Sequence, residues 1–92
     1  MIGSFRHKGL KEFFETGSKR GISPELAARI ARRLDVINAA QGLMDIDAHG
    51  FNLHRLKGGR QGEWSISVSG NWRITFGFSK GEAFDINLED YH

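Results

Sequence analysis

The sequence predicts an α+β fold in which two N-terminal helices pack on one face of a small, mainly antiparallel twisted sheet. The prediction follows from a change in hydrophobic spacing. Apolar residues recur about every 3.6 positions in the N-terminal half and about every 2 positions in the C-terminal half. With 92 residues, 39% of them hydrophobic, the chain is long enough for one core only. Residues 1–92 are therefore expected to form a single domain.

The N-terminal region is predicted to hold an edge strand and a short helix. The segment from Ile2 to Phe5 is expected to add a strand at the edge of the sheet. Leu10, Phe13 and Phe14 fall at i, i+3 and i+4, so they share one helix face. Gly17 is predicted to end this helix, because glycine readily adopts the left-handed conformation of a helix C-terminus.

A second helix is predicted between Ser23 and Gly42. Ser23 is a favourable N-cap, Pro24 suits the first helical position, and Glu25 supplies an early acid. Gly42 is expected to close the helix. A single apolar stripe runs along the predicted helix, formed by Leu26, Ile30, Leu34 and Ile37.

The C-terminal half predicts a three-stranded antiparallel meander. Segments 63–69 and 71–78 alternate apolar with polar residues, as half-buried strands do. Turns are predicted at 69–71 and at Lys80-Gly81, and a further strand around Phe51 and Leu53. The residues expected to face the helices are Trp64, Ile66, Val68, Trp72, Ile74, Phe76, Phe78, Phe84, Ile86 and Leu88.

The same alternation predicts a polar, water-exposed face on the other side of the sheet. Its expected members are Ser65, Ser67, Arg73, Thr75, Asp85 and Asn87. Asn52 and His54 are expected to turn toward this face, and Tyr91 to continue the row of Asn87 and Glu89. One concave polar surface is therefore expected to collect His54, Lys57, Arg73 and Tyr91.

Charge is unevenly distributed along the chain, although the formal net charge is only +2. Residues 1–34 carry +5 and residues 51–73 carry +3, whereas 35–50 and 74–92 carry −3 each. Basic blocks of this kind attract a polyanion or an acidic protein. Arg29, Arg32 and Arg33 lie off the apolar stripe of the second helix, so they are expected to form either a solvated face or an interaction surface.

Composition excludes several classes of protein. Without cysteine the chain forms no disulfide and no thiolate metal site, and a reducing cytoplasm is the simplest setting. No apolar stretch approaches the ~20 residues that span a bilayer, and residues 1–8 lack the apolar run of a signal peptide, so no membrane partner is expected. Metal-ligand spacing, a Gly-rich phosphate loop and a Ser or Cys nucleophile motif are also missing, so no cofactor is expected.

Metal-free acid–base chemistry is the enzymatic function that these residue types fit. Cleaving RNA in this way requires a base for the 2′-hydroxyl, cations on the phosphoryl oxygens and an acid for the departing 5′-oxygen. His54 and the C-terminal residues 89–92 concentrate such groups. The structural alternatives are a hydrogen-bonded core role for His54, an ion pair of Arg73 with Asp85 or Glu89, and a frayed chain end. His7 and His49 lack such context and are expected to have ordinary surface or loop roles.

Read as strings, the residues resemble the HigB-type toxins of the RelE/ParE superfamily. The matching strings are Leu53-His54-Arg55-Leu56-Lys57-Gly58, Trp64-Ser65-Ile66, Asn71-Trp72-Arg73-Ile74-Thr75-Phe76 and Glu89-Asp90-Tyr91-His92. The opening segment 2–10 matches the usual start of these proteins, so the resemblance covers essentially the whole chain. It implies a RelE/ParE-like microbial ribonuclease-type fold and a bacterial type II toxin, an endoribonuclease that cleaves translated messenger RNA. The implied partners are a HigA-like helix-turn-helix antitoxin and the ribosome, at its A site and ribosomal RNA.

The resemblance also implies the site residues. The family's active site maps onto His54, Asp90, Tyr91 and His92, with Lys57 and Arg73 as phosphate-binding cations. We expect Asp90 or His92 to act as base toward the 2′-hydroxyl and His54 as acid or partner in proton transfer. Tyr91 is expected to stack on or orient a base, and Arg73 to bind the scissile phosphate.

The chain departs from the family pattern at two positions. Relatives often have proline where Arg55 stands and a basic residue where Ser69 stands. Arg55 offers a cation in place of the one missing at Ser69, and Arg55 and Arg60 are further candidates for RNA binding. The arginines of the second helix are expected to meet either the antitoxin or ribosomal RNA.

Two other functions remain open. A ParE-like toxin of the same fold binds DNA gyrase, but the presence of His54 and the terminal Asp-Tyr-His argues against it, because a binder needs no acid–base set. The other is a non-catalytic module that binds RNA or a partner protein through the polar face.

Overall fold

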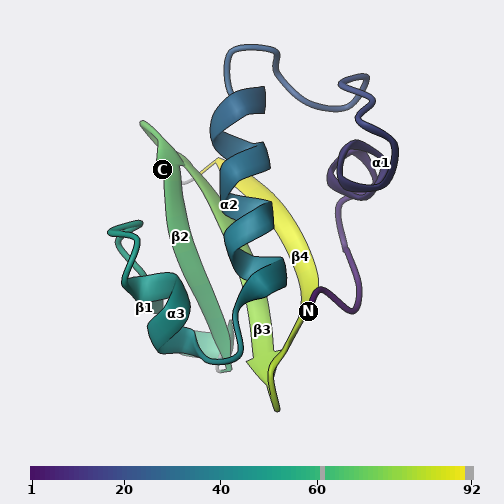
Figure 1. Cartoon of the computed structure of the whole chain (residues 1–92). Coiled ribbons are helices and arrows are strands. Elements are labelled where there is room, and N and C mark those ends of the chain that lie inside the picture. Colours follow the sequence, from purple (N-terminus) through teal and green to yellow (C-terminus); the bar gives the residue numbers. More distant parts are fainter. Residues whose placement is uncertain (61, 91–92) are drawn as a thin grey trace.

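The computed structural model describes residues 1–60 and 62–90, in which helices cover one face of a four-stranded sheet (Figure 1). The strands are β1 (His54–Arg55), β2 (Glu63–Ser69), β3 (Trp72–Ser79) and β4 (Glu82–Asp90), antiparallel in the order β1-β2-β3-β4. Helix α2 (Ala27–Ala39) packs across the sheet against β2 and β4, and α1 (Lys8–Thr16) packs against β4. The predicted α+β class and the meander of β2 to β4 are confirmed.

The hydrophobic core lies between α2 and the sheet. Apolar residues of α2 at helical spacing meet alternate residues of the strands, as the two periodicities predict. The apolar side chains with no more than 1% exposure from these elements are Ile30, Leu34, Ile37, Ile66, Ile74, Phe76, Ala83 and Ile86. Burying each large aliphatic or aromatic side chain stabilises the fold by roughly 1.5–3 kcal/mol. This core fixes the sheet whose other face carries the candidate site.

Helix α1 begins and ends with side-chain and backbone caps. At its start, His7 Nδ1 accepts a hydrogen bond from the Leu10 backbone N–H at 3.0 Å. At its end, Gly17 has φ of 80° and donates its N–H to the Phe13 carbonyl at 2.9 Å, as the sequence predicts. His7, expected to have an ordinary surface or loop role, thus has a structural role as the cap of α1.

The predicted limits of the second helix are wrong at both ends. The carbonyl of Ser23 accepts from the Leu26 N–H at 3.0 Å and closes a turn, so α2 begins at Ala27 rather than beside Pro24. The helix ends at Ala39, because Ala40 has extended backbone with φ of −69° and ψ of 135°. Gly42 instead precedes a further short helix, α3 (Leu43–Asp47), which the sequence did not predict.

The chain on either side of the helices also differs in part from the prediction. Ile2 and Phe5 pair with β4 in parallel, as expected of an added edge, but only as isolated bridges to Ala83 and Ile86. The strand predicted around Phe51 begins three residues later, at His54. Asn52 interrupts it with a left-handed φ of 60°, a conformation that asparagine tolerates better than most residues.

The predicted alternation of β4 fails at a bulge. The pairing between β3 and β4 shifts between Thr75 and Gly77, and Asp85 has φ of 53°. The extra residue places Ala83 and Ile86 on the core side, while Phe84 pairs opposite Gly77 on the other face. A Cβ at Gly77 would overlap the Phe84 ring, so only glycine fits beneath it. The prediction that Phe84 faces the helices is therefore wrong.

Two predictions about exposure are also wrong. Ser65 and Thr75, expected on a water-exposed face, are both 0% exposed. Trp72, expected in the core, is 37% exposed, because it stands at the beginning of β3 where the pairing with β2 shifts. The polar face is therefore covered at Ser65 and Thr75. The segment that follows β1 lies over this face and lines the candidate site.

Candidate active site

A pocket of about 450 Å³ opens over the polar face of the sheet near β1. Its walls come from three elements that the fold brings together: β1, the segment through the short helix η1 (Gly58–Arg60), and β3. The lining residues are His54, Arg55, Leu56, Lys57, Arg60 and Arg73. The pocket therefore brings together five predicted site residues, all of them in this list except Leu56.

His54 is held in a defined orientation by hydrogen bonds at both ring nitrogens. Its Nδ1 lies 3.0 Å from the Asn52 carbonyl oxygen, and its Nε2 lies 3.1 Å from Ser65 Oγ. Because a carbonyl oxygen only accepts, Nδ1 carries a proton, and in the neutral ring Nε2 accepts from the Ser65 hydroxyl. Asn52, which supplies this carbonyl, has a left-handed φ of 60°. The two contacts orient the imidazole, and orientation is what proton transfer by a histidine requires.

Arg60 joins two carboxylates at the floor of the pocket. Its Nη1 donates to Glu89 Oε1 at 2.7 Å and its Nη2 to Glu89 Oε2 at 2.5 Å, a bidentate pair. Its Nη2 also donates to Glu63 Oε1 at 2.9 Å. The pKa of the Arg60 guanidinium is raised, chiefly by its hydrogen bonds to Glu89. The sequence predicted that Arg60 binds RNA, but its guanidinium is instead bound by two carboxylates of the protein itself.

Glu89 is the centre of this network. Besides Arg60 it accepts from Thr75 Oγ1 at 2.8 Å and from Arg73 Nη2 at 3.4 Å. These donors, led by the Arg60 guanidinium, lower the pKa of Glu89 from 4.5 to about 2. Arg60 likewise lowers the pKa of Glu63. Both carboxylates are therefore ionised at neutral pH and bind the two arginines across three strands.

Arg73 forms an ion pair across the sheet and also lines the pocket. Its guanidinium reaches Glu89, which confirms the cross-sheet ion pair, and the side chain is only 17% exposed. It also lines the pocket beside His54. A guanidinium held from below in this way presents its donors in a fixed geometry, which suits a phosphate above it.

The rim of the pocket carries the exposed cations. Lys57 and Arg55 are both exposed. The Arg55 guanidinium lies 5.3 Å from the centre of the Trp64 ring, a cation–π contact that holds it on the edge of the sheet. The pocket residues and their two carboxylates together leave an excess of positive charge, since the rim cations have no carboxylate partner among the described residues.

A second hollow of about 170 Å³ continues from the first and shares His54 and Arg73 with it. Its remaining lining residues are Asn52, Ser65, Ser67, Gly70, Asn71 and Trp72. The exposed Trp72 stands at its edge. Together the two hollows form a groove along the polar face that passes over the His54 imidazole.

Asp90, another predicted site residue, is the last residue of β4. Asp90 is exposed and pairs with Trp72 in the register of β3 and β4. Tyr91 and His92 fall outside the described residues. Ser69 lies at the end of β2, where the pairing shifts, and is not among the groove's lining residues.

The sequence had offered Glu89 as part of the terminal segment and as an ion-pair partner of Arg73. It missed Glu63 and the burial of Ser65 and Thr75 as parts of the site. The strand alternation carried a signal for the two hydroxyls, because it places Ser65 and Thr75 on the same face of the sheet as Arg73 and Glu89. Among residues 1–60 and 62–90 there is no group of three or more His, Cys, Asp or Glu side chains able to hold a metal ion. No helix in the same residues has the length and apolarity needed to cross a membrane.

Comparison with known proteins gives two findings. Residues 3–92 match the HigB-like toxin family, described as the RelE-like toxin of the type II toxin–antitoxin system HigB. The Endoribonuclease HigB of Proteus vulgaris is 48% identical over 92 residues, which is the full length of both chains. The groove described above is therefore found in a chain that is similar to a ribonuclease over its whole length.

Proposed function

Because this chain belongs to the HigB-like family of RelE-like toxins of type II toxin–antitoxin systems, we propose that it is an endoribonuclease that cleaves messenger RNA during translation. The observation that best supports this is the groove in which the His54 imidazole lies among basic side chains. A phosphodiester is attracted by such cations, and an oriented imidazole transfers protons beside it.

The proposed reaction uses the RNA's own 2′-hydroxyl as nucleophile. Its oxygen attacks the adjacent phosphorus in line while its proton passes to a base on the protein. The bond from phosphorus to the 5′-oxygen breaks, and that oxygen takes a proton from an acid. The products are a 2′,3′-cyclic phosphate and a free 5′-hydroxyl, so atoms and charges balance without a further reactant.

The proposed roles of Arg73 and His54 are supported by their positions, and those of the C-terminal residues by the family resemblance. Arg73 is proposed to bind the scissile phosphate, because it is fixed by Glu89 at the floor of the groove. His54 is proposed to act as acid or as partner in proton transfer through Nε2, which would exchange its contact with Ser65 Oγ for the RNA, while Nδ1 stays on the Asn52 carbonyl. Asp90 or His92 is proposed as the base. Tyr91 is proposed to stack on or orient a base of the RNA.

The other cations divide into two kinds. Lys57 and Arg55, exposed on the rim, are proposed to bind RNA phosphates. Arg60 is proposed as a positioning residue, because its guanidinium is bound by Glu63 and Glu89 and orients the carboxylate that holds Arg73.

A toxin of a type II system has an antitoxin partner, and we propose that it is a HigA-like helix-turn-helix protein. The proposed place of action is the ribosomal A site in the bacterial cytoplasm, where messenger RNA is presented to the groove.

The test is a translation reaction in which new 5′ ends are mapped on one messenger, with and without its start codon. We expect cleavage of the translated copy only. His54→Ala and Arg73→Ala should each lower the cleavage rate by about 10²-fold or more, as expected for a positioned proton-transfer group or cation. Arg20→Ala removes an exposed arginine from the loop before α2, serves as the matched control, and should leave the rate unchanged.

Other outcomes would contradict the proposal in distinct ways. Growth arrest with intact messenger and blocked DNA supercoiling would indicate a gyrase-binding toxin. Full cleavage by a folded Arg73→Ala variant would remove Arg73 from the phosphate site. Circular dichroism of each variant establishes that a loss of cleavage is not a loss of folding.

A further inference from the structure

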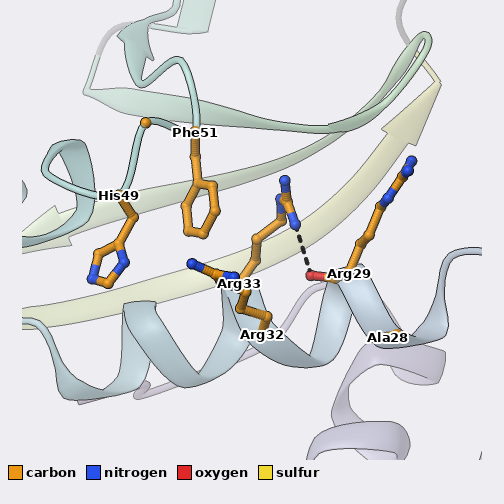
Figure 2. A pocket seen from close by; sticks show the side chains of 7 residues that line it. Ala28, Arg29, Arg32, Arg33, His49 and Phe51 are labelled. Atoms are coloured by element: carbon orange, nitrogen blue, oxygen red, sulfur yellow. Dashed lines mark hydrogen bonds between the residues drawn. The ribbon is translucent and has the colours of Figure 1, made fainter.

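A second basic pocket, also of about 450 Å³, lies between α2 and the segment 49–51 that precedes β1. Figure 2 shows Arg32 and Arg33 of α2 near the ring of Phe51, with His49 on the other side of that ring and Arg29 pointing away from it. The pocket shares no lining residue with the groove over the polar face. Its lining residues are Ala28, Arg29, Arg32, Arg33, His49, Gly50 and Phe51.

Arg33 is fixed at the back of this pocket. Its Nε donates to the Ser67 carbonyl at 2.6 Å and its Nη1 to the Arg29 carbonyl at 3.1 Å. The guanidinium carbon lies 4.3 Å from the centre of the Phe51 ring. Burial, and then the charges of Arg29 and Arg32, lower the pKa of Arg33. One cation is thus immobilised beside two others of the same sign.

Arg29 and Arg32 are exposed at the front of the pocket. Within residues 1–60 and 62–90, none of the salt bridges involves any of the three arginines. Like charges three and four residues apart on a helix repel one another, so this cluster weakens α2 when no anion is bound. An anion between Arg29 and Arg32 would relieve the repulsion.

The aromatic part of the pocket offers a stacking surface. The imidazole of His49 stacks on Phe51 with ring centres 5.7 Å apart and planes 18° apart. Phe51 is itself buried, only 6% exposed, while His49 is exposed. The outer face of the imidazole is therefore available to a planar group beside the guanidiniums, the combination on which single-stranded nucleic acids bind.

The second pocket is connected to the candidate active site by backbone hydrogen bonds of Ser67. The carbonyl of Ser67 accepts from Arg33, and its N–H donates to the Phe51 carbonyl at 2.9 Å. Ser67 also lines the smaller hollow of the groove, together with His54. The two basic regions are thus neighbours across Ser67, and one polynucleotide chain passing over this part of β2 would meet both.

We propose that this pocket binds RNA, with Arg29 and Arg32 on phosphate oxygens and the His49 imidazole stacked on a base, next to the strand segment held in the groove. The choice of RNA as ligand rests on the proposed ribonuclease function. The lining residues suit a protein partner less well. Protein interfaces have an apolar centre, whereas Phe51, the large apolar side chain of this pocket, is buried beneath Arg33.

Binding of a 20-nucleotide 2′-O-methyl RNA, followed by fluorescence anisotropy at several salt concentrations, tests the proposal. The methyl groups block attack by the 2′-oxygen, so binding is measured apart from cleavage. We expect Arg29→Gln/Arg32→Gln to weaken binding about tenfold and to reduce the slope of log K against log salt by about 1.4. Lys11→Gln/Lys19→Gln removes two exposed charges elsewhere, is the matched control, and should leave the slope unchanged.

A third variant separates stacking from charge. His49→Ala should weaken binding by about fivefold or more with little change in the salt slope, because a stacking contact neutralises no phosphate. Equal slopes and affinities for the wild type and Arg29→Gln/Arg32→Gln would overturn the proposal. So would a larger loss of affinity for a 20-residue polyglutamate peptide than for the RNA, which would assign the pocket to an acidic protein. Either result leaves cleavage by the groove unaffected, so failure here is distinct from failure of the ribonuclease proposal.

Discussion

Glu89→Gln tests the carboxylate network beneath the groove through its dependence on pH. In the folded protein Arg60, and then Thr75, lower the pKa of Glu89 from 4.5 to about 2. Each unit of pKa difference between folded and unfolded states is worth ~1.4 kcal/mol, so Glu89 contributes about 3 kcal/mol of stability at pH 7. The side chain is only 21% exposed, so solvent screens this contribution less than at an open surface.

The sign of the pH dependence follows from the lowered pKa. The contribution is fully present above the unfolded pKa of Glu89 and is lost as the pH falls toward its folded pKa. At pH 3 about 1.4 kcal/mol should remain. Glu89→Gln imitates the protonated carboxyl group, so its free energy of unfolding should fall below that of the wild type by about 3 kcal/mol at pH 7 and approach it in acid.

Urea unfolding at pH 7, 5, 4 and 3, followed by tryptophan fluorescence, measures both free energies. Every other carboxyl group titrates in both proteins, so the difference between the two isolates Glu89. Glu15→Gln, an exposed carboxylate on α1, is the matched control and should differ little from the wild type at any of these pH values. A gap between the wild type and Glu89→Gln that is constant from pH 7 to pH 3 would refute the reasoning.

Three further changes test the fold that carries the site. Gly77→Ala should destabilise the protein by about 2 kcal/mol, because its Cβ meets the Phe84 ring, and Phe84→Ala in the same chain should recover part of the loss in a double-mutant cycle of urea midpoints. His7→Ala removes the cap on the Leu10 N–H and should cost about 1 kcal/mol by thermal unfolding, whereas an unchanged transition would mean that the cap contributes nothing. Phe76→Ala should cost about 3–5 kcal/mol, since Phe76 is 0% exposed in the core, and a loss below 1 kcal/mol would contradict its central position.

The regular parts of the fold could be predicted because hydrophobic spacing and turn residues act locally. The alternation from Trp64 to Leu88 predicts three strands, and Gly17 predicts where α1 ends. The bulge at Asp85 could not be predicted in this way. One residue with positive φ reverses the facing of Phe84 and Ala83, and aspartate is compatible with both a regular strand and a bulge.

The position of His54 and Arg73 on one face was predictable, because the sheet and the strand alternation together place them there. The commitment of Arg60 to Glu89 was not, since it depends on how the segment after β1 folds back over β4, across 29 residues of sequence. Ser65 and Thr75 are buried because the same segment lies over them. Local periodicity specifies which face a strand residue takes, but not what lies above that face.

The division between bound and exposed cations gives the groove a rationale in the proposed mechanism. Arg60 and Arg73 are balanced by Glu63 and Glu89, so their guanidiniums stay in place without a ligand and avoid mutual repulsion at the floor. An RNA phosphate then meets an arginine that is already oriented, and little reorganisation is needed as charge builds on its oxygens. The attraction over longer distances comes from the exposed rim, where Lys57 has no carboxylate partner among the described residues. Removing Glu89 should therefore impair the chemical step more than RNA binding, and removing Lys57 should do the reverse.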